Sequence, residues 1–228
     1  GTRAGGGPCS RDPRPALDGG RLRLGAGHRG EKGLNPLDST PGLVLLTGGA
    51  SRRFGSPKHL QPHPSGGSWG AWLVGVFTRA LGDGPVRILG EPLAERPDLP
   101  RLDDPRDGPA QALVHWAARE QVEARRWWIV ACDQVRWDPP ELAAWHAAAA
   151  EADPEGRAWV IAALNGEPQP LGGFLGGALL GGLAGSPERR LLQLARTVPQ
   201  RLLPWRTEPF LDLDDRASAE AWRRRRQG

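Results

Sequence analysis

The 228-residue sequence contains only two cysteines, Cys9 and Cys132, and neither methionine nor tyrosine. Two cysteines cannot build a disulfide framework, so we expect a reducing, cytoplasmic location. The longest apolar stretches, such as Ala143–Ala150, are far too short for a membrane span. A signal-peptide pattern of charge, apolar run and small-residue cleavage site is also missing. We therefore expect neither export nor a membrane partner.

A basic stretch is also missing from the middle of the sequence, although the pI is about 10. Residues 1–42 carry a net charge of +3, Arg223–Arg226 add +4, and the whole chain has +4, so the residues between sum to −3. A nucleic-acid-binding groove would carry its positive charge on the folded body. We therefore expect no nucleic-acid partner.

The composition changes near residue 43. Residues 1–42 contain eleven glycines and five prolines and show no apolar periodicity. Such a segment buries too little surface to offset the entropy of ordering it. We predict a disordered Gly/Pro/Arg-rich extension over residues 1–42 and one folded domain over residues 43–228, which is long enough to bury a core without disulfides.

Short apolar strands alternate with helical segments through the folded part. We predict strands at Leu43–Thr47, Pro85–Leu89, Trp127–Ala131, Arg157–Leu164 and Phe210–Leu213, and helices at Ser68–Leu81, Pro109–Val122, Pro139–Ala150 and from Ala217 onward. This alternation indicates an α/β fold with a single doubly wound, mostly parallel sheet covered on both faces. Ligands bind such sheets at the carboxyl ends of the strands. The residues that follow the strands are therefore the functional candidates.

The strongest local signal is the loop after the first strand, Leu-Thr-Gly-Gly-Ala-Ser-Arg-Arg-Phe-Gly-Ser-Pro-Lys from Leu46 to Lys58. The adjacent Gly48 and Gly49 let the backbone approach an anion, and Arg53 and Lys58 add positive charge. Backbone donors beside cations suit a nucleoside triphosphate. The spacing excludes a P-loop, and the alanine after the two glycines excludes the dinucleotide fingerprint. A Gly-rich surface turn with incidental charges is the plainer alternative.

This loop resembles the signature loop of the molybdenum cofactor guanylyltransferases, which belong to a wider nucleotidyltransferase superfamily. The matching residues are Leu46, Gly48, Gly49, Ser51, Arg53, Gly55 and Lys58. Thr47, Phe54 and Pro57 replace the usual Ala, Met and Asp. The resemblance implies a Rossmann-like nucleotidyltransferase fold. It also implies nucleotide binding by Leu46, Gly48, Gly49, Ser51 and Lys58, and catalytic stabilisation of phosphate charge by Arg53 and Lys58.

Asp104, Gly108 and Pro109 resemble the family's Asp followed by Gly-Pro at the start of a helix. There the Asp contacts the nucleotide, so the resemblance implies nucleotide binding by these three residues, with Asp104 helping to select the base. Asp103 could be the matching acid instead. An acidic loop before a helix would have the same sequence without binding a nucleotide.

Asp133 follows the apolar strand Trp127–Ala131 and resembles the family's Cys-Asp-x-Pro site, whose Asp holds Mg²⁺. The resemblance implies that Asp133 is both a catalytic residue and a metal ligand. Magnesium suits such a place because it prefers one or two carboxylates together with phosphate oxygens and water. Val135 stands where the family has its proline, which puts the shape of the loop in question.

Two later segments resemble the family more loosely. Gln169–Phe174 is similar to a Pro-Leu-x-x-Tyr segment on the cofactor side of the cleft, although its glycines also fit a flexible hairpin. Phe210–Asp215 is similar to Asn-x-Asn-Thr-Pro-Glu before the last helix, with Asp212 and Asp214 in place of the asparagines. We predict Asp214 as a second metal ligand.

The histidines and tryptophans are weaker candidates for a functional site. His59 and His63 have a zinc-like spacing, but the prolines around them break any helix and no third ligand follows. Most of the ten tryptophans, including Trp72, Trp116, Trp127 and Trp145, sit in predicted strands or on helix faces, which indicates core packing rather than base stacking.

The resemblance thus implies an Mg²⁺-dependent transfer of GMP from GTP to the phosphate of the molybdenum cofactor, with release of pyrophosphate. The substrates would be GTP and the molybdopterin cofactor, and the partners would be molybdoenzymes or cofactor-delivery proteins that receive the product. In the superfamily the Gly-Gly form of the loop goes with guanine and an Ala-Gly form with cytosine. The alternatives are a cytidylyltransferase, a transferase for another phosphate such as a sugar phosphate, and a nucleotide-binding protein without catalysis.

Overall fold

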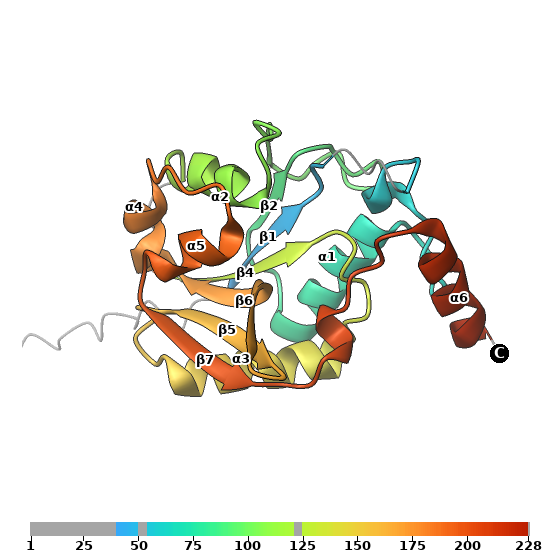
Figure 1. Cartoon of the computed structure of the whole chain (residues 1–228). Coiled ribbons are helices and arrows are strands. Elements are labelled where there is room, and N and C mark those ends of the chain that lie inside the picture. Colours follow the sequence, from blue (N-terminus) through green and yellow to red (C-terminus); the bar gives the residue numbers. More distant parts are fainter. Residues whose placement is uncertain (1–39, 50–53, 121–124, 228) are drawn as a thin grey trace, which may run out of the picture. The chain divides into compact units, whose positions relative to one another are not determined.

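The computed structural model describes residues 40–49, 54–120 and 125–227, which fall within one compact unit, Leu34–Gly228. They form a seven-stranded sheet in the order β3-β2-β1-β4-β6-β5-β7 (Figure 1). The strands are β1 (Gly42–Leu46), β2 (Val86–Leu89), β3 (Arg101–Leu102), β4 (Arg126–Ala131), β5 (Trp159–Leu164), β6 (Glu167–Gly176) and β7 (Gln200–Pro204). All pairs are parallel except those of β6 with β4 and β5. The predicted single, mostly parallel sheet is confirmed.

Helices cover both faces of this sheet (Figure 1). Helices α1 (Trp69–Leu81) and α3 (Pro139–Ala152) pack on one face, and α2 (Pro109–Ala117), α4 (Leu180–Leu183) and α5 (Leu191–Arg196) on the other. The last helix, α6 (Arg216–Gln227), joins the core on the α1 side through Ala219 and Trp222. This is the doubly wound arrangement that the alternation of elements predicts.

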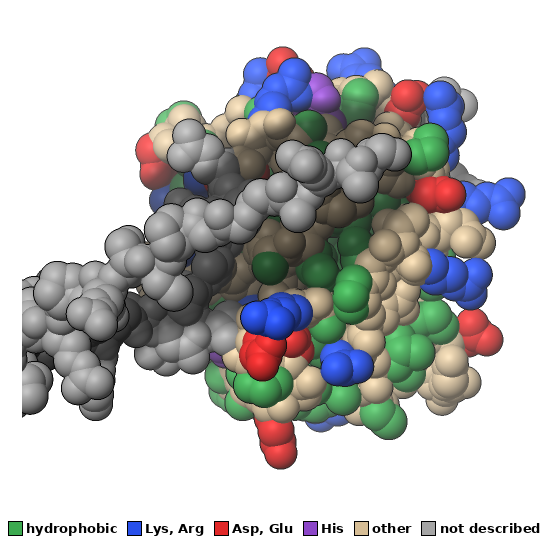
Figure 2. Space-filling model, turned by 90° about the vertical axis from the view of Figure 1, so that its left-hand side faces the viewer, with side chains coloured by type: hydrophobic (Ala, Val, Ile, Leu, Met, Phe, Trp, Pro, Cys, Tyr) green, Lys and Arg blue, Asp and Glu red, His purple; other side chains and the backbone are tan. Residues whose placement is uncertain are grey.

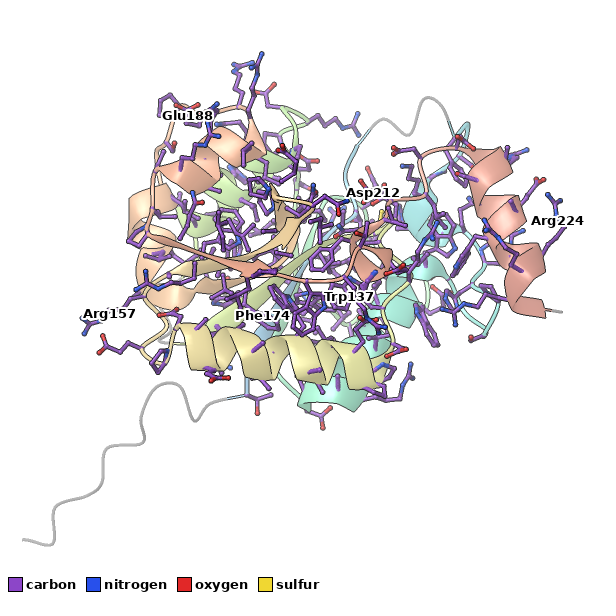
Figure 3. The ribbon with its side chains drawn as sticks, turned by 60° about the horizontal axis from the view of Figure 1, so that its bottom comes forward. Trp137, Arg157, Phe174, Glu188, Asp212 and Arg224 are labelled. Carbon is purple, nitrogen blue, oxygen red and sulfur yellow. The ribbon has the colours of Figure 1, made fainter. Side chains whose placement is uncertain are left out.

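The core strands are almost wholly apolar because both of their faces are covered; the charged exceptions in β1, β2, β4 and β5 are Arg87 in β2 and Arg126 at the start of β4. In β4, Trp128 and Val130 belong to the cluster beneath α1 and α3, whereas Trp127 and Ile129 belong to the cluster beneath α2 and α5. Successive side chains of a strand point to opposite faces, so a strand covered on both sides has no polar face. Figure 3 shows Trp137 and Phe174 packed between α3 and the sheet.

The helices begin where their capping residues predict. The side chain of Ser68 accepts a hydrogen bond from Ala71 N at the start of α1. Asp138 accepts one from Glu141 N at the start of α3, which has prolines in its first turn. Both satisfy amide groups that have no partner inside the helix. The two helices thereby start next to the loops that carry the candidate residues.

Two expectations for individual elements are wrong, and one open alternative is not what the structure shows. Phe210–Leu213 is not a strand, because Glu208–Phe210 form a 3₁₀ turn and the last strand is β7. The glycine-rich segment Gln169–Phe174 is not a flexible hairpin but part of the ten-residue strand β6. Helix α2 ends at Ala117 rather than at Val122, and residues 121–124 lie outside the described part.

Figure 2 shows Lys and Arg side chains interspersed with Asp and Glu side chains over the visible described face. No continuous basic surface lies on that face among the described residues. Nor is any helix in the described ranges long and apolar enough to cross a membrane.

Candidate functional site

A cleft of about 1550 Å³ opens at the carboxyl ends of β1, β2 and β4. The cleft brings together residues from the loops after β1, β2, β3 and β4 and from the segment before α6. Among the predicted site residues, those that line it are Leu46, Gly48, Gly49, Lys58, Asp104, Gly108, Pro109 and Asp133. Ser51 and Arg53 lie outside the described residues. Asp214 does not line the cleft wall but contacts Lys58, which does.

The ends of β1 and β2 come into close contact beneath the glycine loop. Thr47 donates its side-chain hydrogen bond to the carbonyl of Glu91 at 2.7 Å, and the amides of Thr47 and Gly48 both donate to Leu89 O. Gly90 has a φ of +120°, and a Cβ on it would overlap Gly48 N. Only glycine fits a left-handed backbone at so close an approach. The glycine loop therefore rests on a rigid base.

Asp104 reaches from the end of β3 to the glycine loop. Its carboxylate lies against Gly48, where an added Cβ would overlap Oδ2 and lie 2.7 Å from Cγ. The other oxygen, Oδ1, accepts a hydrogen bond from Arg106 N at 2.8 Å. This turn holds the half-buried carboxylate on the cleft wall. The absence of a side chain at residue 48 is thus what makes room for Asp104.

Lys58 stands between two carboxylates on the opposite side of the cleft. Its Nζ lies 2.7 Å from Asp133 Oδ2 and 3.0 Å from Asp214 Oδ1. The side chains of Lys58 and Asp133 are 13% and 15% exposed, whereas that of Asp214 is 65% exposed. Burial disfavours the charged ammonium, but the hydrogen bonds and charges of the two aspartates outweigh it and raise the pKa of Lys58.

Asp212 is a third carboxylate at this site, and it was not among the predicted site residues. It lines the cleft, while Leu213, its neighbour, is fully buried in the core. Although Asp212 is exposed on the cleft wall, desolvation by the protein and then the charges of Asp133 and Asp214 raise its pKa to about 7. The Asp-Leu-Asp pattern could have revealed it, because the apolar Leu213 packs in the core while the aspartates on either side stay exposed.

The loop after Asp133 closes without the family's proline. Gln134 is only 2% exposed, and its side chain accepts from Ala131 N and donates to Phe210 O, both at 3.3 Å. In addition, Leu213 N donates to Asp133 O at 3.3 Å. These bonds join the end of β4 to the segment before α6. They bring Asp133 and Asp212 to the same side of the cleft.

These carboxylates fit a magnesium ion. Asp133 and Asp214 already face one common cation, the ammonium of Lys58, and Mg²⁺ takes one or two carboxylates with its remaining ligands from phosphate and water. Within the described ranges, no group of three or more His, Cys, Asp or Glu side chains is placed to hold a metal ion by itself. The donor set therefore suits a metal that is shared with a phosphate-bearing ligand.

Strand β6 adds one residue to the described lining of the cleft. Leu171 lines the cleft, and the next residue, Gly172, has a φ of +81°. The carbonyl of Gly172 accepts hydrogen bonds from the indoles of Trp128 at 3.1 Å and Trp145 at 2.8 Å. Two buried donors on one carbonyl fix the backbone at this point. The backbone next to Leu171 is thus held in place by contacts within the core.

The other candidates from the sequence, His63, Cys132 and most of the tryptophans, are buried side chains that contribute to packing. His63 is buried, stacks on Trp72 with ring centroids 4.0 Å apart and packs edge-on to Trp222, and burial lowers its pKa to about 4. The thiol of Cys132 is buried, and that burial raises its pKa, so it is a poor nucleophile at neutral pH. Trp116, Trp127 and Trp145 are fully buried, as core packing requires.

Several solved structures share this fold. Rv0371c from Mycobacterium tuberculosis H37Rv matches with a TM-score of 0.61 at 18% identity, over 82% of this chain and 99% of that one. The same protein in complex with manganese gives a TM-score of 0.53 at 16% identity, over 74% and 89% of the two chains. Molybdopterin-guanine dinucleotide biosynthesis protein A from Archaeoglobus fulgidus gives 0.61 at 14% identity, over 82% and 98%. CMP:2-keto-3-deoxy-manno-octonic acid synthetase complexed with CTP gives 0.58 at 11% identity, over 82% and 98%.

A search of curated protein sequences found no match. The sequence profile of the MobA-like NTP transferase domain, however, matches residues 43–204. That range runs from β1 through β7 and contains the glycine loop, Asp104 and Asp133. The chain therefore belongs to the MobA-like NTP transferase family and is a nucleotidyltransferase.

Proposed function

We propose that the protein transfers GMP from GTP to the phosphate of the molybdenum cofactor and releases pyrophosphate. The observation that carries the choice of guanine is the contact between Gly48 and Asp104. Guanine presents N1–H and N2–H donors on one edge, and the carboxylate of Asp104 is an acceptor fixed at the cleft wall. The similarity in fold to the A. fulgidus guanine dinucleotide protein supports the choice of acceptor.

The reaction requires no nucleophile from the protein. An oxygen of the acceptor phosphate attacks the α-phosphorus of GTP in line, a new phosphoanhydride bond forms, and the bond to the β-phosphate oxygen breaks as pyrophosphate leaves. The amide of Gly49 would donate to phosphate oxygens, whereas that of Gly48 already donates to Leu89 O. Lys58 and Arg53 would neutralise charge on the triphosphate.

Asp133, with Asp214 beside it, is the proposed holder of Mg²⁺. When bound, the ion would supply positive charge between phosphate oxygens and so lower the barrier to attack by a second anion. The carboxylates would place the positive charge of the ion at the carboxyl end of β4. Leu46, Gly108 and Pro109 would shape the nucleotide side of the cleft, and β6 the acceptor side.

The test is pyrophosphate release with Mg²⁺ and molybdopterin cofactor, with GTP, CTP and ATP run in parallel. Release with GTP alone is expected. Release with CTP alone would replace the proposal by a cytidylyltransferase, an alternative that the CTP-bound structural relative supports. Nucleotide binding without release in any mixture would indicate another acceptor or an inactive nucleotide-binding protein.

Asp133→Asn separates an enzyme from a binding protein. Loss of the charge that holds the metal should lower turnover by roughly a hundredfold or more, because metal-assisted charge stabilisation contributes several kcal/mol. Asp98→Asn is the matched control, since Asp98 is an exposed carboxylate paired with Arg96 and does not line the cleft. Equal rates for the two variants would contradict the role of Asp133.

A further inference from the structure

Lys58 is an unusual choice of cation in this chain. The sequence has 28 arginines and two lysines, Lys32 and Lys58, so Lys58 is the one lysine among the residues that the structure describes. An arginine presents a flat fork of donors, whereas a lysine presents a compact point charge on a flexible stem. Two carboxylates that contact a single atom are better matched by the compact ammonium of a lysine than by the wide fork of an arginine.

The ammonium occupies the position that a divalent ion would need. Asp133 Oδ2 and Asp214 Oδ1 both contact Nζ, at 2.7 Å and 3.0 Å. Magnesium needs direct contact with its carboxylate oxygens, so it would compete with the ammonium for these two. Two cations held by the same pair of oxygens also repel each other strongly, so binding of one favours departure of the other.

Polyphosphate gives the ammonium another partner. Lys58 lines the same cleft as Gly48 and Gly49, so a phosphate in that cleft competes with the carboxylates for the lysine. The flexible four-carbon stem of lysine lets the ammonium move to the phosphate without any movement of the backbone. The nucleotide would then release the carboxylates for a metal ion at the moment when its own oxygens can complete the coordination.

We propose that Lys58 is an internal counter-ion of Asp133 and Asp214 that keeps free divalent ions out of the cleft until a nucleotide draws the lysine away. The displacement of Lys58 by a nucleotide rests on the proposed function, whereas the competition between Lys58 and a divalent ion does not. It makes the site bind metal and nucleotide together rather than metal first.

The experiment measures Mn²⁺ binding, by calorimetry or by the electron paramagnetic resonance of free Mn²⁺, to the full chain without nucleotide. Lys58→Met keeps the stem and removes the charge, and Lys58→Gln repeats the test with a polar side chain. Arg106→Met is the control, because it removes a positive charge that lines the same cleft but pairs with Glu91. Circular dichroism checks that each variant is folded.

Lys58→Met and Lys58→Gln should bind Mn²⁺ roughly tenfold more tightly or better than the wild type, because a like charge at contact distance is removed. Arg106→Met should change the affinity by less than about threefold, since its charge is solvent-screened. GTP should tighten Mn²⁺ binding strongly in the wild type and much less in Lys58→Met. Unchanged or weaker Mn²⁺ binding in both Lys58 variants, or an equal gain in Arg106→Met, would overturn the proposal.

These outcomes separate the inference from the proposed reaction. If the Lys58 variants gain Mn²⁺ affinity but GTP neither binds nor releases pyrophosphate, the counter-ion role stands and guanylyl transfer fails. If GTP is turned over but the Lys58 variants gain no Mn²⁺ affinity, the counter-ion role alone fails.

Discussion

Gly48→Ala should weaken the preference for guanine without unfolding the protein. The backbone of Gly48 is outside the left-handed region, so alanine can adopt it. The new Cβ would overlap Asp104 Oδ2 and lie 2.7 Å from Cγ, where ordinary contact begins at 3.4 Å. The carboxylate must therefore retreat by roughly 1 Å or more, which is enough to break a hydrogen bond to a base held in the cleft.

The expected loss follows from that one interaction. A hydrogen bond to a charged group contributes about 1.5–3 kcal/mol, so GTP should bind roughly 10- to 150-fold more weakly. CTP, which lacks the adjacent N1–H and N2–H donors of guanine, should change by less than about threefold. Competition binding with GTP, ITP and CTP measures the effect, and ITP, which lacks the 2-amino group, should fall between the other two in the wild type.

A double-mutant cycle with Asp104→Ala tests the reasoning. Once the carboxylate is gone, the Cβ at residue 48 has nothing to displace, so Gly48→Ala should have little effect in that background. An equal loss in both backgrounds would mean that the Cβ obstructs the phosphates directly. Undiminished preference for GTP in Gly48→Ala would refute the role of the Gly48–Asp104 contact.

Two further predictions concern stability. Burial lowers the pKa of His146 from 6.5 to about 4, so the folded state resists protonation, and stability is complete above pH 6.5 and declines towards pH 4. His146→Phe should flatten that decline in urea unfolding measured at several pH values, and an unaltered pH dependence would count against it. Gly172→Ala should lower the free energy of unfolding by about 1–3 kcal/mol, because its φ is +81° and a Cβ would lie 2.8 Å from Phe210. A melting temperature within about a degree of the wild type would contradict this.

The apolar strands and the loop beside them could be predicted because their signals are local. The run of apolar residues in β1 and β4 follows from burial on both faces, and the double glycine after β1 follows from a close backbone approach. Each of these features needs only its immediate neighbours in the sequence. The sheet topology then places the ends of β1 and β4 side by side.

Strand β6 could not be predicted in the same way. It contains Pro168, Pro170 and several glycines, all of which are poor strand formers. It becomes a strand because β4 and β5 pair with it on either side, and because the Trp128 and Trp145 indoles hold the carbonyl of Gly172. These partners are distant in the sequence, so no local pattern reports them.

The excess of carboxylates in the cleft could not be predicted either, because the strand pairing brings them together from distant parts of the sequence. The described lining includes the carboxylates of Glu91, Asp103, Asp104, Asp133 and Asp212, but only Lys58 and Arg106 as Lys or Arg side chains. From these described side chains a polyphosphate meets more repulsion than attraction. Backbone amides and a divalent ion must then supply most of the compensation. Because Lys58 is already engaged by Asp133 and Asp214, bringing in the ion and freeing the lysine are one step. An acidic cleft of this kind therefore favours a nucleotide that arrives with its metal over either one alone.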